Sequence, residues 1–300
     1  MKYALLFVVF ILTFTQAKEM TPNQLWQTLR SDPYTTLPQY KVSFGKLFTW
    51  SKNLILADAN RTLESHADLL APYEKLAHPN GVCLRGTWHI SQNNPYSGYF
   101  KKGKTSLIVA RVSSAMSATK SGEVRAFGFA GKLFGTTNPN HRSTNPTANF
   151  FTIDDLGGTR AKHFSDVALT NEPSISTNSE VVKHLLYALK VSKAFSTADS
   201  HPNIRQLYEI AQLREKGKVR TPKWLRLTTK TPLNTDAIDF RDELTLNKQQ
   251  KWVFDIAVSS EKKEGNIVWQ HIGTITLEDS VTSKSCDQRL HFHHPKWREE

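Results

Sequence analysis

Short runs of apolar residues separated by turn residues dominate the chain from residue 81 onward. The runs are rich in β-branched and aromatic side chains, and glycine, asparagine, proline and serine stand between them. This pattern is typical of short β-strands. The predicted strands cover residues 82–90, 106–113, 124–134, 149–154, 224–228, 252–258, 267–277 and 289–292. Short strands at close spacing favour an antiparallel barrel or sandwich.

Helical patterns lie before and within this series of strands. Residues 180–195 carry one apolar stripe at helical spacing, and a second helix is predicted over residues 204–215. Residues 18–70 lean toward helix and form an N-terminal arm. We therefore expect an α+β fold with flanking helices, in which a β-barrel domain over residues 71–300 contains a helical insertion around residues 179–215.

The N-terminus has the three parts of a secretory signal. Lys2 is followed by the uncharged run 3–14, and small residues stand at Thr15 and Ala17. Twelve apolar residues are too few to span a bilayer, which needs about 20. The sequence predicts a signal peptide over residues 1–17 and an exported protein, periplasmic or secreted, without stable membrane insertion. A single uncleaved anchor is the alternative.

Composition and charge narrow the class of protein. The 300 residues carry 39 Lys+Arg against 27 Asp+Glu, a net charge of +12, with only 14 Gly and 13 Pro. These values exclude disordered and collagen-like chains. Residues 213–230 hold seven basic side chains against one acid, which favours contact with anionic surfaces, although a charged linker explains the same run. An exported protein is not expected to meet nucleic acid, and a homo-oligomer is compatible with the sequence.

Cys83 and Cys286 are the two cysteines of the chain. Export makes a disulfide between them permissible. Cys83 lies inside an apolar strand-like run, however, and two buried free thiols satisfy the same pattern. The sequence leaves both possibilities open.

Three polar residues stand close to predicted strands in the first half of the barrel. His78 lies in a loop directly before a strand, from which a rigid scaffold could aim it into a cavity, although a lone histidine is more often a surface or core residue. Arg111 and Ser113 share one face of the next strand by the two-residue period. An arginine that points into a barrel requires an anionic partner.

Four segments around these residues resemble the motifs of the haem catalase family. Residues 74–82 are similar to its E-R-V-V-H-A-K-G motif, and residues 110–114 to V-R-F-S-T. Residues 128–134 are similar to G-F-A-V-K-F, and residues 145–151 to N-N-T-P-I-F-F. The four matches follow in the family's order over roughly residues 70–155. Fainter matches to V-G-K-L-V-L and L-A-F-D-P follow near residues 272–277 and 287–292.

The resemblance implies an antiparallel barrel of the catalase type that binds haem and splits peroxide. In this comparison His78 is the general acid and base, and Asn145 orients the peroxide. Arg111 pairs with a haem propionate, for which a guanidinium fork is well suited. Ser113 hydrogen-bonds to His78, and Lys75 takes the place of the family's arginine three residues before the histidine. Asn149 is an alternative for the role of Asn145.

The family's proximal iron ligand is a tyrosine in an R-x-x-x-Y motif beyond the V-G-K-L-V-L strand. The sequence contains no such motif after residues 272–277, so haem binding stays an open expectation. Residues that could substitute are Tyr187, Tyr208, His291, His293 and His294. His291 and His293 also share one face of a predicted strand and could hold a transition metal, but a solvated terminal strand explains them equally, and we assign no metal site.

Two functions are therefore compatible with the sequence. The first is an exported, catalase-like, haem-dependent oxidoreductase that acts on hydrogen peroxide or organic peroxides. The alternative is a non-catalytic catalase-fold protein that has lost the proximal haem ligand and serves in binding or host interaction.

Overall fold

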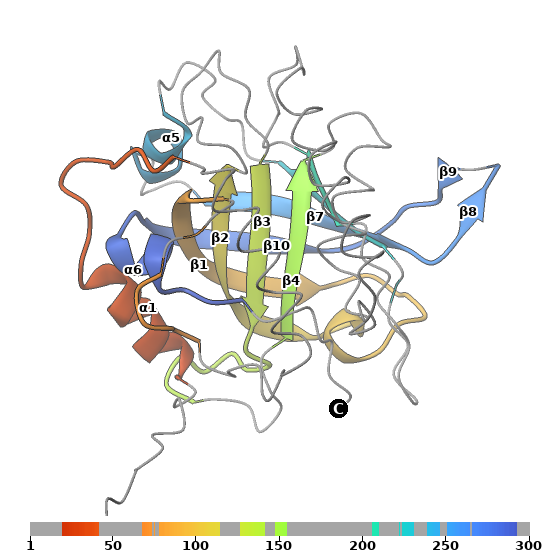
Figure 1. Cartoon of the computed structure of the whole chain (residues 1–300). Coiled ribbons are helices and arrows are strands. Elements are labelled where there is room, and N and C mark those ends of the chain that lie inside the picture. Colours follow the sequence, from red (N-terminus) through yellow and green to blue (C-terminus); the bar gives the residue numbers. More distant parts are fainter. Residues whose placement is uncertain are drawn as a thin grey trace, which may run out of the picture.

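Eight antiparallel strands form one strongly curled sheet in the computed structural model (Figure 1). The structure describes residues 20–41, 68–73, 75, 78–114, 127–141, 148–154, 206–209, 222, 224–230, 239–246, 251–264 and 266–292. The strands are β1 Asn80–Ile90, β2 Thr105–Ser114, β3 Phe127–Leu133, β4 Ala148–Asp154, β5 Gln206–Glu209, β6 Trp224–Thr229, β7 Trp252–Ser259 and β10 Gln270–Val281.

Strand pairing runs around the sheet in the order β1-β10-β7-β6-β5-β4-β3-β2, and β1 also pairs with β2. The shortest pairing in the sheet is that between β4 and β5, which consists of Ile153↔Tyr208 and Asp154↔Leu207. A register shift between Arg85 and Gly86 marks a bulge in β1 opposite β10. Bulges bend a strand and increase its twist, so this one helps the sheet curl.

Apolar residues of six strands fill the inside of the curled sheet. Val82, Leu84 and Trp88 of β1 lie in one apolar core with residues of β2, β3, β6, β7 and β10, including Phe129 and Phe254. These two rings meet edge to face, with centroids 5.4 Å apart. The interior is therefore packed with side chains of the kind that the alternating apolar pattern predicts.

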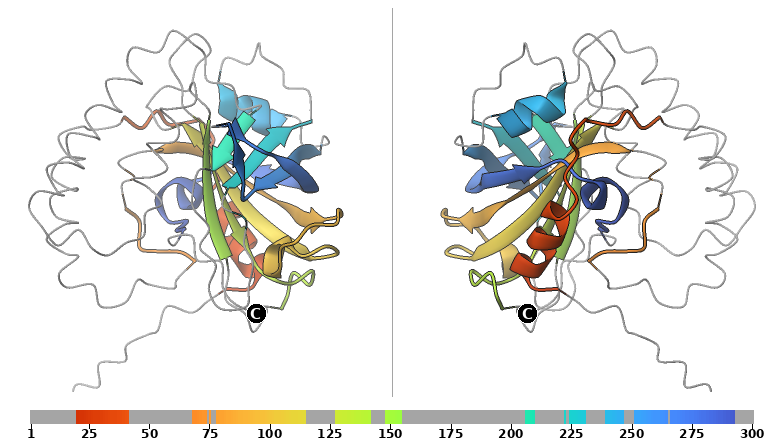
Figure 2. Two further views of the ribbon diagram at one scale, coloured as in Figure 1. Left: turned by 90° about the vertical axis from the view of Figure 1, so that its right-hand side faces the viewer. Right: turned by 90° about the vertical axis from the view of Figure 1, so that its left-hand side faces the viewer.

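The opposite, outer face of β1 and β2 is covered by helices. Helix α1 (Pro22–Arg30) begins at a capping box between Thr21 and Gln24 and packs its apolar side against Cys83 and Val109. Helix α6 (Lys284–Gln288) lies beside α1 on the same outer face (Figure 2). Figure 1 also shows α5 (Phe240–Leu246) at one end of the sheet, and a small hairpin of β8 (Lys262–Lys263) and β9 (Asn266–Ile267) that projects from it. The 3₁₀ helix η1 spans Gly98–Phe100.

A disulfide joins Cys83 of β1 to Cys286 of α6, so the two cysteines are not free thiols. Both sulfur-bearing residues are fully buried in the outer apolar cluster with α1. The bond therefore ties the last described helix to the first strand.

Seven of the predicted strands are confirmed with small differences in their bounds, and a helix is confirmed in the N-terminal arm. Two predictions are wrong. Residues 206–209 form β5 rather than part of a helix, because they pair with β6. Residues 289–292 are not a strand, since the chain turns after α6 and Leu290 makes a single bridge to Leu69.

The predicted signal peptide and the helix over residues 180–195 lie outside the described residues. None of the described helices is long and apolar enough to cross a membrane.

Removal of the disulfide is expected to lower the free energy of unfolding by about 5 kcal/mol in the chain-entropy model. The bridged residues are 203 positions apart, so the bond restricts a very large loop of the unfolded chain. Urea unfolding of the Cys83→Ala, Cys286→Ala double variant against wild type measures the change. Alkylation of both cysteines in unreduced, denatured wild-type protein would contradict the bond itself.

Candidate functional site

Arg111 and Ser113 lie on the outer face of the sheet, where Arg111 contacts α6, and not inside the barrel. Val112 and Ala110 of β2 belong to the interior core, so Arg111 and Ser113 occupy the opposite face by strand alternation. The sequence correctly predicts that these two residues share a face. Arg111 does not point into the interior, which is filled by apolar side chains.

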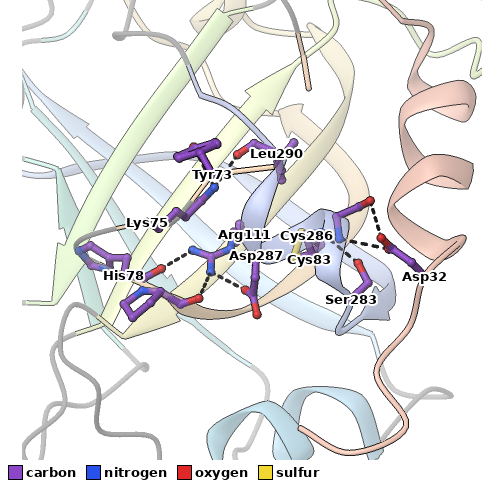
Figure 3. Close-up of a disulfide and its surroundings, with 12 residues drawn as sticks. Asp32, Tyr73, Lys75, His78, Cys83, Arg111, Ser283, Cys286, Asp287 and Leu290 are labelled. Atoms are coloured by element: carbon purple, nitrogen blue, oxygen red, sulfur yellow. Dashed lines mark hydrogen bonds and ion pairs between the residues drawn. A yellow bond between two sulfur atoms is a disulfide. The ribbon is translucent and has the colours of Figure 1, made fainter. Parts of the chain in front are cut away.

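Arg111 is almost fully buried, and its guanidinium is engaged by three oxygen atoms (Figure 3). One terminal nitrogen donates to the carbonyl of His78 at 2.9 Å. The other donates to the carbonyl of Pro79 at 3.1 Å and to Oδ1 of Asp287 at 2.6 Å. Gly81 lies against the guanidinium, since a Cβ built there would be 2.5 Å from Cζ of Arg111.

Asp287 supplies the negative charge that a buried arginine needs. Its side chain is 1% exposed, and burial raises the pKa of the carboxyl while Arg111 acts to lower it. The residue belongs to α6, whose first turn is capped by the Ser283 hydroxyl, which accepts from the Cys286 N–H at 3.0 Å. Cap and disulfide thus both act on the turn that carries Asp287.

His78 stands at the start of β1 in a left-handed backbone conformation, with φ of 58°. Its Nδ1 is hydrogen-bonded to Oγ of Ser113 at 3.2 Å. Burial, followed by the positive charge of Arg111, lowers the pKa of His78 to about 3, and hydrogen bonding to Ser113 acts in the opposite direction. The imidazole is therefore neutral at physiological pH, and one of its nitrogens is held by a hydroxyl.

Lys75 lies next to this pair and donates to neutral oxygen atoms. Its Nζ is 2.9 Å from both the Tyr73 hydroxyl and the Leu290 carbonyl. Burial and then the charge of Arg111 lower the pKa of Lys75 to about 6, and Asp287 opposes the shift. A lysine in this setting is readily restored to its charged form by an approaching carboxylate.

A second buried ion pair lies on the same outer face and was not predicted. Lys132 of β3 is fully buried, with Nζ 3.0 Å from Oδ1 of Asp68. The other oxygen of Asp68 accepts from the N–H of Met20 at 2.9 Å. A lysine within an apolar strand was the available signal, but its partner is 64 residues away in sequence (132 − 68).

The remaining predicted residues are not brought together by the described structure. Asn145 and Tyr187 lie outside the described residues. Asn149 is the register partner of Lys132, and Tyr208 is placed in β5. His293, His294 and most of the basic stretch 213–230 also lie outside. Among the described residues, no group of three or more histidine, cysteine or acidic side chains could hold a metal ion, and His291 follows α6 without regular structure.

No protein-family model matches the chain, and no curated protein matches it in sequence. Solved structures that are similar include a bacterial catalase with a TM-score of 0.43 and 14% identity, where the match covers 83% of this chain and 55% of the other. A fungal catalase matches with a TM-score of 0.40 and 14% identity over 83% of this chain and 58% of its own. Catalase A from Saccharomyces cerevisiae gives 0.37 and 14% identity over 76% of this chain and 55% of its own.

The matched part of this chain thus spans little more than half of each catalase. The likeness concerns the general arrangement of the chain and assigns no role to any residue, so the function has to be argued from the geometry around His78.

These residues fit a haem in part. His78 and Ser113 provide a neutral, oriented imidazole, and the residues beside Arg111 and Ser113 on β3 are the small Ala130 and Gly128. The Lys75 ammonium could meet a haem carboxylate. Arg111 does not fit that role, because both terminal nitrogens are used within the chain and Asp287 already neutralises its charge.

Replacement of Gly81 by alanine is expected to destabilise the protein by about 1–3 kcal/mol, as overpacking of a dense site does. The added Cβ would displace a guanidinium that three oxygen atoms hold. Urea unfolding of Gly81→Ala in wild-type and Arg111→Ala backgrounds forms a double-mutant cycle. An equal loss in both backgrounds would show that Arg111 is not the obstacle.

Acidification is expected to cost stability through His78. The pKa is about 3 in the folded protein and 6.5 ordinarily, so the unfolded chain binds more protons between these values. The stabilising contribution is complete above pH 6.5 and is lost as the pH falls toward 3. Urea unfolding between pH 4 and 7 should show a weaker pH dependence for His78→Gln than for wild type. His89→Gln, at an exposed histidine of β1, is the control, and parallel curves for all three proteins would contradict the assignment.

Proposed function

We propose that this chain is an exported haem-binding protein that acts on hydrogen peroxide or organic peroxides, with His78 as the group that moves a proton. The observation that carries the proposal is the buried, neutral imidazole whose Nδ1 is held by Ser113. Transfer of a proton from one peroxide oxygen to the other needs a base that is uncharged at the start and can return the proton.

Each of four residues would have a separate role at the haem. His78 would accept and return the proton through its other ring nitrogen, Nε2, which is buried. Ser113 fixes the orientation of the ring, and Lys75 would meet a haem carboxylate. Asn145 would orient the peroxide, as the family resemblance implies. When bound, the haem supplies the redox chemistry of peroxide cleavage.

The disulfide supports export as part of the proposal. Such bonds form and persist in oxidising compartments, namely the periplasm or the extracellular space. Cys83 and Cys286 are paired across the outer face of the domain. An N-terminal signal peptide over residues 1–17 would bring the chain to such a compartment.

A second candidate is a binding protein of the same fold that takes no haem. The Arg111 to Asp287 pair favours it, because the cation expected to meet a haem propionate already has a carboxylate partner. Anionic surfaces met through residues 213–230 are the partners that such a protein would have.

Haem supplied to the purified protein separates the two candidates. The first predicts a Soret band that titrates with haem, together with peroxide consumption that falls by about 10²- to 10⁴-fold in His78→Ala, the range of general acid–base catalysis. Ser113→Ala should lose less, because the imidazole remains.

His89→Ala is the matched control, since its imidazole is exposed on β1, the strand that follows His78. Absence of a Soret band in the wild-type titration would remove the enzymatic proposal and leave the binding protein. A normal rate in His78→Ala with haem bound would mean that His78 is not the proton carrier.

A further inference from the structure

We propose that Arg111 and Asp287 are positioning residues for His78, with Asp287 acting as the built-in carboxylate that the resemblance would otherwise assign to a haem propionate. The catalytic consequence of this inference rests on the proposed function. The positioning itself does not, because it can be measured in the protein without haem.

The first step is the fixation of Asp287. Cys286, its neighbour in α6, is bonded to Cys83 of β1 (Figure 3). The N-terminal segment holds the same helix, since both carboxylate oxygens of Asp32 accept from Ser285, one from its N–H and one from its hydroxyl. Two independent attachments therefore determine where the Asp287 carboxylate lies.

The second step runs from Asp287 to Arg111. The contact between Oδ1 and the guanidinium is 2.6 Å, and both side chains are at most 3% exposed. Gly81 leaves the room in which the guanidinium lies. Buried carboxylate and guanidinium groups at this distance restrict each other's positions strongly, because water cannot reach either group and take the place of its partner.

The third step runs from Arg111 to the backbone of the turn before β1. The guanidinium donates to two consecutive carbonyls, those of His78 and Pro79. His78 has φ of 58°, a conformation that a residue with a Cβ keeps only where its surroundings impose it. The two hydrogen bonds impose it here, and they place the imidazole against Ser113.

This arrangement assigns different tasks to Arg111 and Lys75. Both terminal nitrogens of Arg111 already donate within the chain, and Asp287 supplies the carboxylate partner. The Nε–H has no hydrogen-bond partner among the described residues, but it is buried against Gly81. Lys75 donates to a phenol and a carbonyl, both of which a charged ligand can replace. Recognition of a haem carboxylate therefore falls to Lys75, and Arg111 acts through His78.

Chemical rescue of Asp287→Ala in the haem-free protein tests the inference, with the imidazole signals of His78 followed by NMR. The variant should move the His78 signal, because Arg111 loses the carboxylate that fixes it and the turn that carries the imidazole is then held less firmly. Acetate or formate at tens of millimolar should restore the wild-type signal, because a small carboxylate can take the vacated place beside Arg111. The same anions should restore nothing in Arg111→Ala.

Asp255→Asn is the matched control, as Asp255 is ion-paired with Lys230 on the same sheet. An unchanged His78 signal in folded Asp287→Ala or Asp287→Asn overturns the proposal. If neither variant folds even with acetate, Asp287 supports the whole fold rather than His78, and the proposal is equally overturned.

A haem titration separates positioning from direct binding. Asp287→Asn frees the Arg111 guanidinium, so tighter haem binding than in wild type would make Arg111 a haem-carboxylate ligand and refute the assignment. We expect unchanged or weaker binding. If wild-type protein takes no haem at all, the proposed function fails while the rescue experiment still decides the positioning role.

Discussion

A guanidinium buried on the outer face of the barrel needs a carboxylate from the same chain. This requirement determines the position of the covering layer, by which we mean α1, α6 and the segment around Asp68. Arg111 would cost about 3–5 kcal/mol if left without a partner, so α6 has to lie where Asp287 reaches it. Lys132 imposes the same condition on the segment that carries Asp68. Strands β2 and β3 thus each carry one buried cation on the outer face. Each cation is paired with an acidic side chain from a segment that is distant in sequence.

The covering layer is held by a disulfide and by hydrogen bonds, in addition to the two ion pairs. The disulfide joins Cys286 to Cys83, Asp32 binds Ser285, and Trp26 of α1 donates to Asp279 of β10 at 3.0 Å. The ion pairs are directional and the apolar packing of α1 is not, so the ion pairs fix the position of the layer that packing alone would leave adjustable.

The strands of the barrel could be predicted because their signal is local. Alternating apolar residues predict β1 and β7, and the short apolar run of β2 predicts a strand that is buried on both faces. β5 could not be predicted, because a run such as 204–215 also suits a helix and only its pairing with β6 decides. The absence of a strand at residues 289–292 could not be predicted for a related reason. These residues follow a helix that begins after Ser283, and contacts with the distant Cys83 and Asp32 determine where that helix lies.

For the site, the sequence could predict which residue types take part and that Arg111 and Ser113 share a face. It could not predict the ion-pair partner of Arg111. Arg111 and Ser113 follow from the period of a strand, and His78 from its place before one. Which face they occupy depends on where the core lies, and that is a property of the whole ring. Asp287 is 176 residues from Arg111 in sequence, so no local pattern connects them. Asn145 lies outside the described residues, so its predicted role stays a prediction.

The same pair that stabilises the turn also sets the chemistry of His78. A positive guanidinium near the imidazole disfavours protonation, and burial acts in the same direction. Asp287 contacts one terminal nitrogen of the guanidinium, and the other terminal nitrogen donates to the His78 carbonyl. Burial is the larger cause of the low pKa of His78, and Arg111 adds to it while also binding the left-handed turn that carries the imidazole.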